Sequence, residues 1–213
     1  KSLDAIADEK SKRAGVNAGQ EVATAILAMR ANDGVTRTVS YQAGTRPGAY
    51  RPTPPDFTPA LHPHWGAITP FALKSSAQFR PAPPPEIGSA QALDDVAVVR
   101  NIGDTTSTTR TDEQTEISKF WYESSPQGWN RIARELPVGR QLHAWSTARL
   151  LALVNVAMAD GFIGGFEAKY HYNYWRPATA IRETVDPTWL NNLPAPPGPD
   201  YPSTHTVLGA PAA

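Results

Sequence analysis

The sequence of 213 residues has no cysteine and no net formal charge, with 20 basic and 20 acidic side chains. Without cysteine there is neither a disulfide framework nor a thiolate metal site, and the redox compartment stays open. No run of four or more like charges marks a patch that would attract a polyanion or a membrane surface. Nucleic acid is therefore not an expected partner.

Long apolar runs and alternating strand patterns are also missing. The longest apolar stretch, residues 150–159, is far shorter than the roughly 20 residues that a bilayer-spanning helix needs. It predicts a buried core helix and no membrane span. No stretch alternates for six residues as a half-buried strand would. The chain starts at Lys1 and finishes in an apolar run without a stop signal, so we expect a chain cut at both ends. A secreted or periplasmic location is favoured, and self-association into a homo-oligomer is left open.

Proline is abundant, with 21 residues, about twice the usual share of roughly 5%. Residues 47–85 are dense in proline, which removes amide donors and prevents helix or inner strand. Embedded aromatics such as Trp65 indicate that this irregular segment wraps a helical body. His62 and His64 could form a metal pair, but loop packing is favoured because no Asp, Glu or Cys cluster accompanies them.

Helical periodicity occurs along the rest of the chain, and the fold class predicted is all-α, a helical bundle in a single partial domain covering 1–213. A first core helix over 17–34 has an apolar face of Val22, Ile26 and Met29. A second helix is expected over 90–103 after a Ser89 cap, and a third after the capping box Thr111–Gln114. Two more are expected over 127–136, ended by Pro137, and over 138–159. A last helix is expected to begin near Phe166, after a bend at Gly161, Gly164 and Gly165.

The stretch "KYHYNYWRP" holds two cations, Lys169 and Arg176, seven positions apart. On one helix they would share a face about 10 Å apart along the axis. Pro177 forces Arg176 out of the α region, where the helix opens into a loop. A guanidinium fork and a movable ammonium together suit a tetrahedral oxyanion such as phosphate. The alternative is two solvated charges whose stems lie over aromatic rings.

The second motif, "PSTH", begins an apolar helix-like run at residue 202. Ser203 can cap this helix or donate its hydroxyl, and the Thr204 amide can point at an anion. His205 in the first turn is the candidate proton donor and acceptor. The alternative is an ordinary serine cap with a histidine beside it.

Four further residues have both a structural and a functional interpretation. Asp160 either caps the glycine-rich bend or balances Lys169, and capping is favoured. Trp175 stacks on the neighbouring arginine or lines a pocket mouth, with plain packing as the alternative. His143 and His171 are interpreted as polar helix residues, and His171 has a weaker functional interpretation as a neighbour of the first motif.

Taken together, these motifs resemble the superfamily of vanadium-dependent haloperoxidases and type 2 phosphatidic acid phosphatases (PAP2). The first signature of that superfamily is a lysine, six residues and Arg-Pro, and the second is Pro-Ser-Gly-His, with Thr204 in the glycine place here. "YNYWRPATAIR" and "PDYPSTH" are similar to the soluble bacterial branch related to vanadium chloroperoxidase.

The resemblance implies that Lys169, Arg176, Ser203 and the Thr204 amide hold vanadate or phosphate, and that His205 is the acid/base residue. In the haloperoxidases, vanadate with hydrogen peroxide oxidises halide, whereas the phosphatases cleave a phosphomonoester in the same pocket.

The chain also departs from the pattern. The third signature, with a further arginine and histidine, is expected after residue 213, and Gly198 stands where this branch commonly has Phe or His. A haloperoxidase-like enzyme is the leading hypothesis. An acid phosphatase and a non-catalytic oxyanion-binding fragment are the alternatives.

Overall fold

The computed structural model describes residues 3–213, which divide into two compact units with their boundary in the sequence between Thr36 and Arg37. The first unit holds a short 3₁₀ helix, η1 (Leu3–Ala5), and α1 (Glu9–Arg30), which Asp8 caps by accepting from the Lys10 amide at 3.0 Å. Helix α1 starts earlier than expected, and none of its residues is buried. The predicted core face on this helix is therefore wrong, because among the described residues its own unit offers no second α-helix to pack against. The assignment of 1–213 to one domain stays a prediction.

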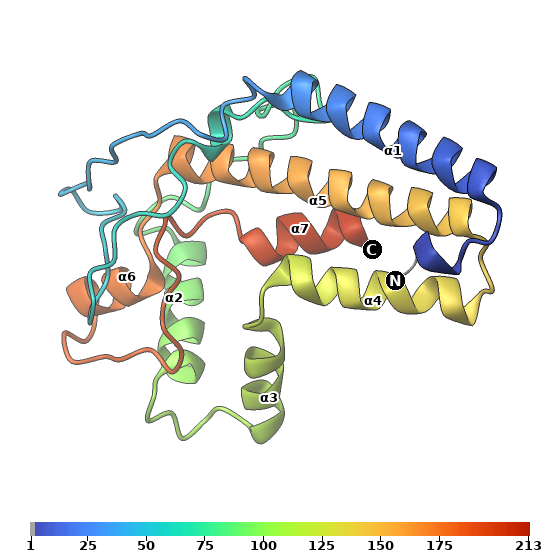
Figure 1. The fold of residues 1–213 in the computed structure, drawn as a ribbon. Coiled ribbons are helices and arrows are strands. Elements are labelled where there is room, and N and C mark those ends of the chain that lie inside the picture. The colour runs from blue at the N-terminus through green and yellow to red at the C-terminus, as the bar shows by residue number, and fades with distance from the viewer. Residues whose placement is uncertain (1–2) are drawn as a thin grey trace. The chain divides into compact units, whose positions relative to one another are not determined.

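The second unit is built from helices and long irregular connections (Figure 1). Its elements are η2 (Trp65–Ala67), α2 (Ala90–Gly103), α3 (Asp112–Trp121), α4 (Ser125–Gly139), α5 (Ala144–Tyr172), α6 (Pro177–Thr184) and α7 (Thr204–Ala212). Over residues 3–213 there is no strand, only isolated bridges between Ala49 and Tyr174 and between Asp104 and Asn191. This confirms the all-α prediction. Residues 47–85 contain only η2, as their prolines predicted.

Helix α5 is the centre of this unit and contacts α4, α7 and η2 (Figure 1). A core cluster of Ala133, Val154, Met158 and Leu208 joins α4, α5 and α7. In the described part of the chain, α5 alone is long and apolar enough to cross a bilayer by length and composition. Buried core helices pass the same test, and α5 buries the charged side chains of Asp160 and Lys169.

Two predicted helix breaks are wrong. Helix α4 continues past Pro137, which is buried near the end of the helix, and the next helix begins only after the His143 cap. No bend occurs at the glycines of α5. A Cβ on Gly161 would lie 2.5 Å from the carbonyl oxygen of Val207, and one on Gly165 would lie 2.6 Å from the Val207 side chain. These glycines therefore allow α7 to pack directly on the α5 backbone.

We expect Gly161→Ala to lower the stability of the fold. The added methyl group meets a backbone oxygen that cannot rotate away, so overpacking should cost about 1–3 kcal/mol. Gly139→Ala, at the end of α4 with nothing within 4 Å of its added Cβ, is the matched control and should be neutral or slightly stabilising. Urea unfolding of both variants measures the difference; equal midpoints would show that α7 does not rest on α5 this closely.

The proline-rich segment is fixed to α5 through buried hydrogen bonds. The Asp160 carboxylate, which is 4% exposed, accepts from the amides of Phe71, Ala72 and Leu73 at 2.6–2.9 Å. Asp160 therefore neither caps a bend nor balances Lys169, and instead it satisfies amides of the irregular segment. At η2, a Cβ on Gly66 would lie 2.6 Å from the Cα of Glu167, so the segment packs directly on the helix. This packing confirms that the segment wraps a helical body.

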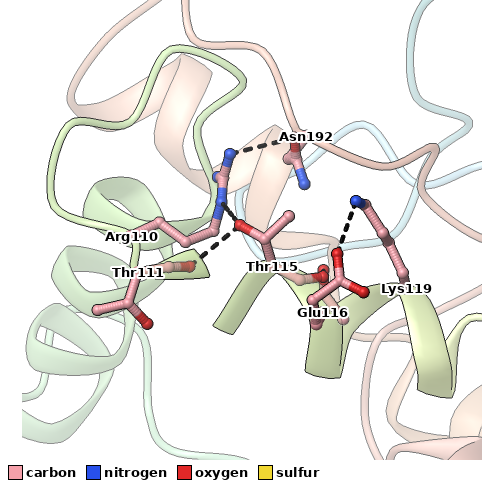
Figure 2. A network of polar contacts seen from close by, with 7 residues as sticks. Arg110, Thr111, Thr115, Glu116, Lys119 and Asn192 are labelled. Carbon is pink, nitrogen blue, oxygen red and sulfur yellow. Dashed lines mark hydrogen bonds and ion pairs between the residues drawn. The ribbon is translucent and has the colours of Figure 1, made fainter. Parts of the chain in front are cut away.

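A second network ties the ends of α2 and α3 to the chain after α6 (Figure 2). Arg110 donates to the carbonyls of Ile102 and Asp104 at 2.8 and 2.7 Å, and to the Thr115 hydroxyl at 3.1 Å. Its remaining nitrogen donates to the side-chain oxygen of Asn192 at 3.2 Å. The Arg110 network therefore anchors the start of the connection that leads from α6 to α7.

Candidate functional site

An elbow between α5 and α6 carries the first motif. Helix α5 ends at Tyr172, and Asn173 adopts the left-handed conformation (φ 49°, ψ 40°) while its amide bonds the Lys169 carbonyl. Arg176 is extended (φ −77°, ψ 150°), as the following proline requires, and Pro177 then begins α6. Lys169 thus lies in α5, whereas Arg176 is the N-cap of α6. The expectation of one shared helical face is wrong, because the asparagine turns the chain four residues after the lysine.

Both cations nevertheless reach the same short stretch of chain. Lys169 is 3% exposed, and its Nζ donates to the carbonyls of Pro199 and Asp200 at 2.8 and 2.7 Å. Arg176 donates through Nε to the Gly198 carbonyl at 2.6 Å and through a terminal nitrogen to the Asp200 carboxylate at 3.0 Å. Neither is a solvated surface charge. Residues 198–200, the acceptor loop hereafter, therefore receive both side chains.

The protonation of Lys169 is perturbed by its surroundings. Burial, together with the neighbouring Arg176 charge, lowers its pKa to about 7, against the smaller opposing effect of Asp200. A neutral amine has two N–H donors, and the acceptor loop already uses two. Only the protonated form has a third donor to offer to another ligand.

The second motif begins α7 as predicted. Ser203 is the N-cap, with its hydroxyl accepting from the Thr206 amide at 3.5 Å. The amides of Thr204 and His205 lie in the first turn, where no partner within the helix exists for them. The acceptor loop ends three residues before Ser203, so both motifs converge on one turn of chain.

The convergence is partial. Within residues 3–213, no hydrogen bond joins Lys169 or Arg176 to the predicted partners Ser203, Thr204 and His205. His205 is exposed and faces a separate cleft of about 440 Å³. This cleft is lined by Tyr122, Asp56, Thr53, Thr58, Ala195 and five prolines, at positions 54, 55, 194, 196 and 197.

The remaining histidines and Trp175, which also had a possible functional role, lie outside the candidate oxyanion site. The rings of His62 and His64 are 6.2 Å apart, and His62 packs on Trp65 at 4.8 Å, which supports loop packing. The described residues contain no group of three or more His, Cys, Asp or Glu able to hold a metal ion. His143 caps α5 by accepting from the Ser146 amide at 3.3 Å, and His171 is exposed. Trp175 is buried and its backbone amide donates to the Gly48 carbonyl at 2.9 Å.

Two residues of the site were missed by sequence reasoning. Asp200 lies within the quoted motif "PDYPSTH", and its carboxylate beside Arg176 could have been anticipated from that position. Tyr50 is 1% exposed, and its backbone amide donates to the Asn173 carbonyl at 2.9 Å. Nothing in the sequence around Tyr50 indicates that the chain returns to the elbow there.

The fold defines the class of this protein: an all-α helical bundle whose two cation-bearing and helix-capping motifs meet at one loop. Residues 149–213 match the family model of the "VCPO second helical-bundle domain". Over 154 residues the chain is 30% identical to the vanadium chloroperoxidase of Curvularia inaequalis, an alignment of 58% of this chain and 23% of that protein. A solved structure titled the first bacterial vanadium-dependent iodoperoxidase is 33% identical with a TM-score of 0.78, covering 89% of this chain and 50% of the other.

These three findings support the vanadium haloperoxidase superfamily and confirm the resemblance. The chain spans about half the length of the iodoperoxidase and about a quarter of the chloroperoxidase.

Proposed function

We propose that this chain forms the oxyanion-binding part of a vanadium-dependent haloperoxidase that oxidises halide with hydrogen peroxide. The observation that carries the proposal is the convergence of Lys169 and Arg176 on the acceptor loop, directly before the N-terminus of α7. The relatives are a chloroperoxidase and an iodoperoxidase, which favours peroxidase over phosphatase chemistry. They differ in their halide, so the proposal names none.

The donor set fits vanadate in kind. Protonated Lys169 keeps one free N–H, and the Arg176 guanidinium uses two of its five donors on the acceptor loop. The first amides of α7 add neutral donors at the positive end of a helix dipole. The loop carbonyls therefore hold the two cations in place and leave the remaining donors for anionic oxygens.

When bound, vanadate would supply a Lewis-acid centre that activates hydrogen peroxide toward halide. The residues of this chain would bind and orient it: Arg176 by two parallel N–H groups, and Lys169 as a point charge that withdraws electron density. His205, at the first turn of α7, would move a proton between the bound oxygens and the proline-lined cleft.

The test is a pair of steady-state assays of the full-length protein. Bromination of a phenol dye with peroxide, stimulated by added vanadate, supports the haloperoxidase. Release of p-nitrophenol from p-nitrophenyl phosphate, inhibited by vanadate, would instead support an acid phosphatase and contradict the haloperoxidase proposal. Oxyanion binding without either turnover would leave only a binding function.

Arg176→Ala should weaken tungstate binding by about 1.5 kcal/mol, roughly tenfold, because a charged hydrogen-bond donor is lost. Arg176→Lys keeps the charge without the planar fork, so we expect it to recover only part of this loss. Arg140→Ala, which removes an exposed cation at the end of α4, is the control and should bind as the wild type does. Isothermal calorimetry with tungstate gives all three affinities; equal values for Ala and wild type would remove Arg176 from the site.

A further inference from the structure

Tyr50 has a buried hydroxyl group without a hydrogen-bond partner among the described residues. The side chain is 1% exposed, and among the described residues its hydroxyl is the one buried side-chain polar atom without a hydrogen-bond partner. Buried hydroxyls are normally paired, because an unpaired one loses its bonds to water without replacement. An orphan of this kind inside a well-bonded region needs an explanation.

The surroundings of Tyr50 place it at the elbow. Its amide donates to the Asn173 carbonyl at 2.9 Å, so its backbone pairs with the residue that separates Lys169 from Arg176. Its own carbonyl accepts from the Gly44 amide at 2.9 Å, and the Tyr41 hydroxyl oxygen lies 3.1 Å from it. The ring lies 5.7 Å from that of Tyr41. Every other polar group of this residue is thus satisfied and fixed.

The charge of Arg176 reaches the phenol. Burial raises the pKa of Tyr50, and the Arg176 guanidinium opposes that rise, with the Tyr41 phenol acting in the same direction as burial. The hydroxyl therefore stays protonated at neutral pH, close enough to Arg176 to be affected by its charge. A protonated hydroxyl beside a cation is a hydrogen-bond donor for an anion that the cation binds.

We propose that the Tyr50 hydroxyl is an additional donor to the oxyanion held by Lys169 and Arg176. The inference rests on the proposed function, since it assigns a further ligand contact in the same site. It explains why the protein keeps a buried hydroxyl unpaired: its partner is the bound anion. The ligand class is a tetrahedral oxyanion with at least one oxygen directed toward the elbow.

Tyr50→Phe tests this, because it removes only the hydroxyl and leaves the ring packing unchanged. Tungstate affinity should fall about threefold to tenfold, the size of one neutral hydrogen bond. The melting temperature without ligand should be unchanged or higher, since no bond within the protein is lost. Tyr172→Phe is the contrasting variant, because the Tyr172 hydroxyl donates to the Pro81 carbonyl at 2.5 Å. This variant should be less stable than the wild type and should bind tungstate with the same affinity.

A second readout is the NMR resonance of Cζ, the ring carbon that carries the Tyr50 hydroxyl. This resonance should shift as tungstate is titrated into ring-labelled protein. If the wild type binds tungstate and Tyr50→Phe binds it equally well, this inference is overturned while the proposed function stands. A melting temperature of Tyr50→Phe below that of the wild type also overturns it. If the wild type itself binds no tungstate, the proposed function fails with it.

Discussion

Glutamine in place of Lys169 should weaken tungstate binding about a hundredfold at pH 6, and the loss should shrink as the pH rises. The first effect follows from removing a buried charged donor, about 3 kcal/mol. The second follows from the lowered pKa of about 7, because the wild-type lysine becomes neutral above it and has no donor left. Tungstate is the probe because its own charge does not change between pH 6 and 9.

The direction of the pH effect is fixed by the protonation states. Above about pH 7 the free site holds a neutral amine, whereas the anion-bound site holds an ammonium, so binding takes up a proton. Wild-type affinity should therefore fall by up to about tenfold per pH unit above 7. Calorimetry at pH 8 in two buffers with different ionisation enthalpies measures the uptake directly. A flat affinity profile from pH 6 to 9 would show that Lys169 stays charged.

The same lysine provides a readout that needs no ligand. In the unfolded chain its pKa is about 10.4, so between pH 7 and about 10 unfolding binds a proton. Over this range the wild type should gain stability relative to Lys169→Gln, by at most about 1.4 kcal/mol per pH unit. Below pH 7 the lysine is protonated in both states, and the difference should stop changing.

His205→Ala should reduce peroxidase turnover about 10²- to 10⁴-fold in the full-length protein and change vanadate affinity little. A positioned acid/base group contributes rates of this size, whereas the proposed oxyanion site uses the cations and the helix amides for binding. His171→Ala is the control, since His171 is exposed and lies within the first motif but has no assigned role. A His205→Ala variant with the wild-type rate would show that another group moves the proton.

Local sequence signals predicted the starts of α2, α3 and α7. The Thr111–Gln114 capping box and the Ser89 and Ser203 caps are all present, because each depends only on residues within one turn. The glycines of α5 were misinterpreted for the opposite reason. Whether a glycine marks a bend or a close helix contact depends on Val207, more than 40 residues away, which local periodicity cannot reveal.

The sequence predicted which residues belong to the candidate site better than it predicted how they are arranged. The spacing of Lys169 and Arg176 indicated an oxyanion site, but a continuous helix was assumed where Asn173 adopts a left-handed turn. The partners of both cations are mostly carbonyl groups, and any residue type carries one, so no sequence pattern marks them. Tyr50 joins the elbow through a backbone pairing between residues more than 120 positions apart.

Four residues, Asn173 to Arg176, separate α5 from α6, so the Lys169 ammonium belongs to α5 and the Arg176 guanidinium to the N-cap of α6. We expect the distance between them to depend on the conformation of this elbow, where the Tyr41 hydroxyl donates to the Asn173 side chain at 2.6 Å. In the proposed site, Tyr41 would therefore influence the width of the anion-binding position without being one of its donors.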